Sequence, residues 1–356
     1  MSPAIDPAHQ AFLPAWLYTS ATIAEREKQH YANRLWHPLT SGPALPEGHT
    51  QAFDLLGLPL LLTRSNGQAR AFINRCPHRG VPLQPPRASA HPCRRLVCPY
   101  HGWTYDLEGR LQAAAREADF LSAFNREDWP LPALHCLERA GLIWVALRDN
   151  PLPLDDQLDL LLQEAGALLE QPRQLLRWHS QTLQCNWKIA HDNTLDDYHV
   201  AIAHPTTLHR EQGPVRRYRH VTTAHASLLA TPHADGGEFL TFGLAPWTHL
   251  LLWPDGRLAL IQFPPLEPER CRMEIWLLGD PALESEADAW LAELQRFLEE
   301  DRRLVEAAQR GYASGLKPGP AHRLERRILQ QQALYRQLMD LSDPELLEPT
   351  SAPWPC

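Results

Sequence analysis

Cys76-Pro77-His78-Arg79-Gly80 and, further along the chain, Cys98-Pro99-Tyr100-His101-Gly102-Trp103 are the two stretches that decide the fold. Each places one cysteine and one histidine on a short segment that proline and glycine mark as a tight loop. A thiolate is a soft metal ligand and an imidazole a borderline one, so the pair of loops suits zinc or an iron-sulfur cluster. The sequence therefore predicts a four-ligand metal site held by two loops.

The spacing of the ligands distinguishes a zinc site from an iron-sulfur cluster. Zinc fingers commonly pair like ligands, whereas each loop here carries one cysteine and one histidine. In a Rieske [2Fe-2S] centre one iron keeps two cysteines and the other takes two histidines. The second loop closely resembles the Rieske signature of Rieske non-haem iron oxygenases, which implies that the [2Fe-2S] ligands are Cys76, His78, Cys98 and His101. A structural zinc site is the alternative, and Cys93, which lacks a histidine three residues on, is a competing ligand of open role.

Length, composition and charge bound the class of protein. A chain of 356 residues has room for two domains, and 44% hydrophobic with 21% charged residues is an ordinary composition for a soluble protein. The formal net charge of -8 argues against nucleic acid or an anionic membrane as a partner. The remaining cysteines are scattered, and no stretch has the pattern of a targeting or membrane-spanning segment. We therefore expect a cytoplasmic protein.

The pattern along the chain predicts an α+β protein in three parts. Residues 1–37 form a leader with a charged helix at Ile23–Tyr31. Residues 38–150 show short strand-like runs with turns such as Arg64–Gly67, which predicts a small antiparallel β domain that carries the cluster loops. Residues 151–356 predict a catalytic domain of the helix-grip type, a curved antiparallel sheet with helices against one face. Its strand candidates are Arg173–Trp187, Arg216–Ala230, Phe239–Trp253, Arg257–Pro264 and Arg270–Leu278.

A second concentration of metal-ligand residues lies just before Pro205. It consists of Asp192, Asp196, Asp197, His199 and His204, interleaved with apolar residues. Non-haem iron(II) oxygenases bind iron with two histidines and one carboxylate. On a helix Asp196 and His199 would share a face, whereas His199 and His204 would point about 140° apart unless the helix distorts or ends between them. Pro205 favours such an ending.

This segment resembles the Asp-x2-His-x4-His motif of the Rieske oxygenase catalytic domain, and its lead-in Asn186-Trp187-Lys188 is also typical of that family. The resemblance implies that His199 and His204 bind iron. It also implies a catalytic role for Asp196, which would bridge His199 of one subunit and His101 of its neighbour. The alternative is that Asp196 only orients His199. The roles of Asp192 and Asn193 stay open.

Helix phase indicates the third iron ligand. An apolar stripe at helical spacing is formed by Trp290, Leu294, Phe297, Leu298, Leu304, Val305 and Ala308. Asp301 falls at the centre of this stripe, whereas Glu300 lies about 100° away. A carboxylate on a buried face needs a cation or hydrogen-bond donors to offset its desolvation. Because the run around Asp301 also resembles the family's third-ligand helix, we predict Asp301 as an iron ligand, with a salt-bridged core aspartate as the alternative.

The three motifs stand in the order found in the oxygenase α subunits of the aromatic-ring-hydroxylating dioxygenase family. The resemblance implies that an NAD(P)H-dependent reductase, with or without a ferredoxin, passes electrons through the [2Fe-2S] cluster to Fe(2+), where O2 and a small organic substrate react. It also implies a homotrimer. We expect an aromatic substrate that is mono- or dioxygenated.

Two alternatives to the oxygenation of an aromatic substrate remain. One is N-demethylation or monooxygenation of a quaternary amine, and the other is a Rieske electron carrier without oxygenase chemistry. A cationic substrate would favour an aromatic cage. The sequence assigns no substrate-binding residue, but by content the cage candidates are Trp247, Trp253, Phe263 and Trp276.

Overall fold

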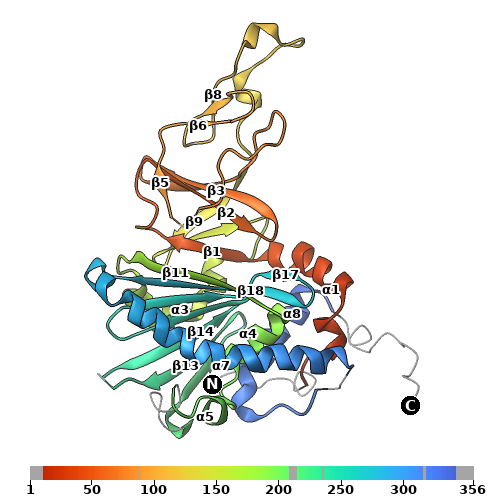
Figure 1. The fold of residues 1–356 in the computed structure, drawn as a ribbon, viewed down its shortest axis with the longest axis vertical. Coiled ribbons are helices and arrows are strands. Elements are labelled where there is room, and N and C mark those ends of the chain that lie inside the picture. Colours follow the sequence, from red (N-terminus) through yellow and green to blue (C-terminus); the bar gives the residue numbers. More distant parts are fainter. Residues whose placement is uncertain (1–10, 88, 208–214, 235, 316–317, 342–356) are drawn as a thin grey trace. The chain divides into compact units, whose positions relative to one another are not determined.

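The computed structural model describes residues 11–87, 89–207, 215–234, 236–315 and 318–341. These residues form two compact units (Figure 1). The first, called here the cluster unit, comprises 36–151 and 170–175. The second, the catalytic unit, comprises the chain up to residue 35, 152–169 and the chain from residue 176 onward.

The cluster unit is built from antiparallel strands. Its larger sheet has the order β1-β10-β9-β4-β3-β2-β5 and its smaller sheet the order β6-β7-β8. The predicted turn at Arg64–Gly67 is confirmed, since Asn66 and Gly67 both have positive φ (55° and 72°) and join β3 to β4 as a two-residue hairpin. The elements are β1 (Trp36–Ser41), β2 (His49–Leu55), β3 (Leu58–Ser65), β4 (Gln68–Ile73), β5 (His91–Pro92), β6 (Leu96–Val97), β7 (Thr104–Tyr105), β8 (Leu111–Ala113), β9 (Ala133–Arg139) and β10 (Leu142–Ala146), with η5 (Glu117–Asp119) and η6 (Arg126–Asp128).

The catalytic unit contains a third antiparallel sheet of order β11-β18-β16-β15-β14-β13-β12, with β17 paired to β18. The long helix α7 lies across this sheet (Figure 1). Together the two units confirm the predicted α+β class with a helix-grip catalytic domain. The strands are β11 (Gln174–Leu183), β12 (Arg219–Thr222), β13 (Ala226–Pro232), β14 (Glu238–Leu244), β15 (Thr248–Leu252), β16 (Leu258–Gln262), β17 (Pro265–Glu267) and β18 (Arg270–Gly279).

The helices of the catalytic unit come from the N-terminal segment and from residue 154 onward. They are η2 (Ala15–Tyr18), α1 (Ala21–Arg26), η3 (Glu27–Tyr31), η4 (Ala32–Arg34), α2 (Leu154–Gln157), α3 (Asp159–Leu169), α4 (Trp187–Leu195), α5 (Val200–Ala203), η7 (Val215–Arg217), η8 (Pro281–Ser285), α7 (Ala287–Ala313), η9 (Arg323–Glu325) and α8 (Arg326–Leu338). Among the helices that the structure describes, none has both the length and the apolar character needed to cross a bilayer.

Three predicted strands are wrong in their extent. Arg216–Ala230 is the hairpin β12-β13, and Phe239–Trp253 is the hairpin β14-β15, whose turn contains a cis peptide before Pro246. A proline is rarely tolerated within a central strand, so Pro246 was the missed signal. The strand predicted at Arg173–Trp187 ends at Leu183, because the Asn186 side chain accepts a hydrogen bond from the backbone of Lys188 at 2.9 Å and starts α4.

Buried polar residues attach the N-terminal helices to α4 and α8. Glu27 is only 1% exposed, pairs with Lys188, and accepts hydrogen bonds from Trp187 Nε1 at 2.8 Å and from the Tyr335 hydroxyl at 2.7 Å. The family-typical Trp-Lys pair therefore serves as the binding partner of a glutamate from the N-terminal segment. These contacts hold α4 in place immediately before the predicted iron ligands.

Asp192, whose role the sequence left open, makes a similar connection. It accepts hydrogen bonds from the Tyr18 hydroxyl at 2.9 Å and from Gln332 Nε2 at 2.8 Å. Burial raises the pKa of Asp192 to about 7, against the opposing effect of these donors and of Lys188. The contacts give Asp192 a structural role that links η2, α4 and α8.

Candidate metal centres

The two cluster loops have the same backbone construction. In each loop the N–H of the cysteine donates to the carbonyl five residues on, and the N–H of the glycine donates back to the cysteine carbonyl, at 2.8 to 3.0 Å. The two glycines, Gly80 and Gly102, have φ of 79° and 70°, a conformation that side chains rarely adopt. This construction explains why Cys76 and Cys98 are each followed by a glycine four residues later.

The four predicted cluster ligands lie in two close pairs, one of cysteines and one of histidines. Cys76 and Cys98 are 1% and 3% exposed, and their thiols interact. The rings of His78 and His101 meet edge to face with centroids 4.5 Å apart, and His78 stacks on Trp103. Within the described residues, Nδ1 of His78 is buried without a hydrogen-bond partner. Two buried thiols beside two imidazoles, one with an unpaired buried nitrogen, fit the donor set of a [2Fe-2S] centre bound by two cysteines and two histidines.

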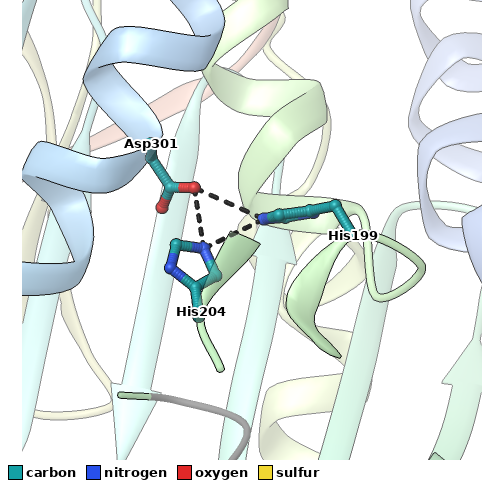
Figure 2. Close-up of side chains that lie close together, drawn as sticks. All are labelled: His199, His204 and Asp301. Carbon is teal, nitrogen blue, oxygen red and sulfur yellow. Dashed lines mark hydrogen bonds and ion pairs between the residues drawn. The ribbon is translucent and has the colours of Figure 1, made fainter. Parts of the chain in front are cut away.

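His199, His204 and Asp301 converge on a common point (Figure 2). The Nε2 atom of His199 lies 3.1 Å from Nε2 of His204 and 3.3 Å from Oδ1 of Asp301, and Nε2 of His204 lies 2.9 Å from the same oxygen. In the part of the chain that the structure describes, no other set of three or more histidine, cysteine or acidic side chains has its donor atoms all within 4.8 Å of one another, and the four cluster ligands do not meet this distance either. Two imidazoles and one carboxylate on one side of a point fit the donor set of a mononuclear iron(II) site.

The convergence depends on a break in the helix. Helix α4 ends at Leu195, and α5 spans only four residues, so His199 precedes and His204 follows a single helical turn. The expected ending of the helix is thereby confirmed. Asp196 has an extended backbone (φ -86°, ψ 106°), so the expectation that it shares a helical face with His199 is wrong. Its carboxylate still reaches that residue, with Oδ2 at 3.3 Å from Nδ1 of His199.

The predicted buried face is confirmed for most of α7. Trp290, Leu294, Leu298 and Val305 are buried, and Asp301 faces the two histidines as predicted. Leu304, which the stripe included, is 45% exposed and was wrongly placed.

Glu300 is the residue of this site that the sequence-based argument missed. Its Oε2 lies 2.6 Å from Nδ1 of His204 and accepts a hydrogen bond from the Thr207 hydroxyl at 3.0 Å. The 100° offset that excluded Glu300 from the ligand position lets it reach the opposite side of the His204 ring. A carboxylate adjacent in sequence to a ligand carboxylate was the available signal.

The carboxylates around the histidines govern their charge. Burial lowers the pKa of His199, but hydrogen bonds to Asp196 and Asp301 outweigh burial and raise it to about 10. For His204 the carboxylates Asp301 and Glu300 likewise outweigh burial and raise the pKa. The pKa of Asp301 is lowered, because the two histidines more than offset its desolvation. The point between the three residues thus favours positive charge, and a metal ion must displace protons to bind there.

A cavity of about 380 Å³ adjoins the three residues. Apolar side chains from β13 to β16 and α7 form much of its lining, among them Leu229, Phe239, Leu251, Trp253, Ile261, Trp290, Leu294, Phe297 and Leu298. Charged groups also line it, namely the carboxylates of Asp196, Asp197, Glu293 and Asp301 and the guanidinium groups of Arg257 and Arg327. Such a concave site with a few polar groups can bind a small organic molecule.

The four aromatic residues considered for a cation cage have different surroundings. Trp253 lines the cavity. Trp247 packs against Trp187, Phe263 against His249, and Trp276 against Trp178.

Comparison with known families and structures defines the class of protein. Residues 35–125 match the Rieske [2Fe-2S] domain, and residues 173–341 match the catalytic domain of the ring-hydroxylating α subunit. The chain belongs to the Rieske non-haem iron oxygenases, as an oxygenase α subunit. It is an oxidoreductase that acts with O2, and its cofactors are a [2Fe-2S] cluster and a mononuclear iron.

The chain is similar to family members of two kinds, quaternary amine monooxygenases and an aromatic dioxygenase. The carnitine monooxygenase oxygenase subunit of Acinetobacter pittii (strain PHEA-2) is 28% identical over 323 residues, with 85% of each chain covered. The quaternary ammonium Rieske monooxygenase CntA in complex with γ-butyrobetaine has a TM-score of 0.81 at 26% identity, covering 93% of this chain and 97% of that one. Naphthalene 1,2-dioxygenase from a Rhodococcus species, bound to indole, shares the fold at 18% identity, with a TM-score of 0.77 and 95% of each chain covered.

Proposed function

We propose that this chain is the terminal oxygenase of a quaternary amine monooxygenase system. The similarity to a carnitine monooxygenase subunit over 85% of both chains carries this proposal. The cavity supports it, because the carboxylate of Glu293 and the ring of Phe297 belong to its lining, and a carboxylate beside an aromatic ring favours a cationic group. The quaternary amine hypothesis is therefore preferred to the aromatic one.

The proposal assigns each metal to residues described above. Cys76, His78, Cys98 and His101 would hold the cluster, and His199, His204 and Asp301 the mononuclear iron. The bound metals would relay electrons from a reductase and would supply the site of O2 activation for C–H oxidation. The overall balance is one O2, two electrons and two protons for one hydroxylated substrate and one water. Hydroxylation of the carbon next to a quaternary nitrogen leads to an aldehyde and a tertiary amine.

The electrons are proposed to come from an NAD(P)H-dependent reductase, directly or through a ferredoxin, and to cross between subunits of a homotrimer. Asp196 would join His199 to His101 of a neighbouring subunit. The Asp196 side chain is 19% exposed, and the apolar side chains of Tyr198 and Ile202 beside it are 56% and 85% exposed. An exposed apolar patch next to a partly exposed carboxylate is what an interface between copies requires. A cytoplasmic location is part of the same proposal, because it supplies NAD(P)H and keeps thiols reduced.

The experiment is purification under anaerobic conditions with iron, followed by O2 uptake with a surrogate reductase and a panel of quaternary amines and aromatic compounds. We expect oxidation of a quaternary amine with release of an aldehyde and a tertiary amine. His204→Ala serves as the control that lacks the iron site. A cis-diol or phenol as the only product would replace this proposal with the aromatic alternative, which the aromatic rings of the lining also accommodate.

A further inference from the structure

The cavity contains one cationic group that internal contacts leave partly unused. Of its two guanidinium groups, that of Arg327 donates to Asp197, to the Thr241 carbonyl and to Ser227. Within the described residues, the guanidinium of Arg257 donates only from Nε, to Oδ2 of Asp255 at 2.7 Å. Within the described residues, Nη1 and Nη2 of Arg257 donate no hydrogen bond.

Two indole rings pack against the Arg257 guanidinium. Its central carbon lies 5.7 Å from the ring centroid of Trp253 and 5.5 Å from that of Trp290, and the two rings meet edge to face at 5.3 Å. A guanidinium held against aromatic faces keeps its in-plane N–H groups available for a planar anion. The aromatic surface that could have received a substrate cation is thus already occupied by a cation of the protein.

Trp290 provides a second unused donor. Its side chain is 5% exposed, and within the described residues its Nε1 is buried without a hydrogen-bond partner. A buried N–H without a partner costs free energy. The side chains of Trp290 and Arg257 lie at the same end of the cavity, because both line it and the guanidinium lies over the Trp290 ring.

This end of the cavity is remote from the iron ligands. Trp290 and Asp301 both lie on α7 and both line the cavity, eleven positions apart, so they are separated by roughly 16 Å along the helix axis. Leu294, Phe297 and Leu298 line the cavity between them. A ligand that reaches both ends is therefore extended, with an apolar middle.

We propose that Arg257, supported by Trp253 and Trp290, binds a carboxylate at the end of an extended substrate, and so places the opposite end at the iron site. The proposal deepens the proposed function, on which it rests for the reaction at the far end. It identifies the substrate as a carboxylate-bearing amine rather than a simple alkylammonium ion. Specificity would then arise at both ends of the molecule.

The test uses iron-loaded holoenzyme and two matched pairs of compounds, each with and without the carboxylate. The pairs are 4-(trimethylammonio)butanoate with n-butyltrimethylammonium, and 4-phenylbutanoate with n-butylbenzene. Anaerobic calorimetry measures binding, and O2-dependent turnover measures oxidation. We expect the carboxylate to improve affinity by at least about tenfold in one pair, and Arg257→Met to abolish that preference.

Three further variants separate recognition from folding. Arg257→Lys keeps the positive charge but loses the coplanar pair of N–H donors that matches a carboxylate. This variant should therefore retain only part of the preference for compounds with a carboxylate. Asp255→Asn removes the partner of Nε and should leave the preference intact. Arg219→Met removes a guanidinium that pairs with Glu238 and Glu164 and serves as the matched control. Thermal unfolding and the visible spectrum of the cluster check that each variant is folded.

The outcomes distinguish this proposal from the one on which it rests. If no compound binds better with its carboxylate, or if Arg257→Met weakens both members of a pair equally, the carboxylate site is overturned even when the amine is oxidised. If only the aryl compounds are oxidised and Arg257→Met removes their carboxylate preference, the site stands and the amine assignment fails.

Discussion

At the scale of the residue, we expect the carboxylates that contact the proposed iron ligands to determine how tightly the site binds iron. Glu300 holds Nδ1 of His204 at 2.6 Å and so fixes the ring that presents Nε2 to the metal point. We expect Glu300→Ala to weaken Fe(2+) binding by about 10- to 100-fold, as measured by anaerobic titration of cluster-loaded protein. Glu299→Ala, which removes a neighbouring carboxylate paired with Arg302, is the control. Unchanged affinity in Glu300→Ala would show that His204 is oriented by other contacts.

The sequence could indicate the proposed ligands but not the residues that contact and orient them. Asp301 was predictable because the phase of one helix places a carboxylate on its buried face. His199 and His204 were predictable as ligands only by resemblance, since helix geometry alone separates them. Glu300 could not be inferred from phase, because its partner is a histidine on another segment. No sequence pattern marked Arg257 as a substrate-binding residue, because its proposed role depends on two indole rings from different elements.

At the scale of the element, a buried ion pair joins the N-terminal helices to α4. Glu27→Ala leaves the Lys188 ammonium buried without its partner, and Lys188 is only 3% exposed. We expect a loss of about 3 to 5 kcal/mol in the free energy of unfolding by denaturant. The double variant Glu27→Ala with Lys188→Met should recover part of this loss. Equal stability of the single variant and the wild type would contradict the account.

Asp192 should make stability depend on pH. Its pKa in the folded protein is raised from an ordinary 3.8 to about 7, so the folded state retains a proton that the unfolded state has lost. The stabilisation that protonated Asp192 contributes is complete below its ordinary pKa of 3.8 and is lost as the pH rises through about 7. Wild type should therefore lose about 1 kcal/mol or more relative to Asp192→Asn between these values, measured by denaturant unfolding at each pH. A constant difference across this range would disprove the shift.

Elements were predictable where a single pattern governed them. The helix around Ile23–Tyr31 was predicted from its composition, but the burial of Glu27 became visible only with its partners from α4 and α8. Hairpins were merged into long strands wherever apolar runs continued through the turn. Pro246 shows that one turn residue can outweigh the surrounding hydrophobic pattern.

At the scale of the whole molecule, the proposed transfer between subunits predicts complementation. Cys98→Ser should lack the cluster but keep the iron site, and Asp301→Ala should keep the cluster but lack the iron. Each homotrimer should be inactive, whereas mixed trimers assembled from both should regain activity, because an intact cluster then adjoins an intact iron site. Substrate-dependent O2 uptake measures the recovery. Asp196→Asn in the Cys98→Ser chain should suppress it, and unsuppressed recovery would exclude Asp196 from the path.

The central claim is that one chain carries two separate iron centres, and the metal and sulfide content of purified protein tests it most directly. The account predicts about two acid-labile sulfides and about three iron atoms per wild-type chain. The double variant His204→Ala with Asp301→Ala should lose only the iron beyond the cluster and keep the cluster's visible spectrum. Zinc without labile sulfide, or a third iron that persists in the double variant, would contradict the account.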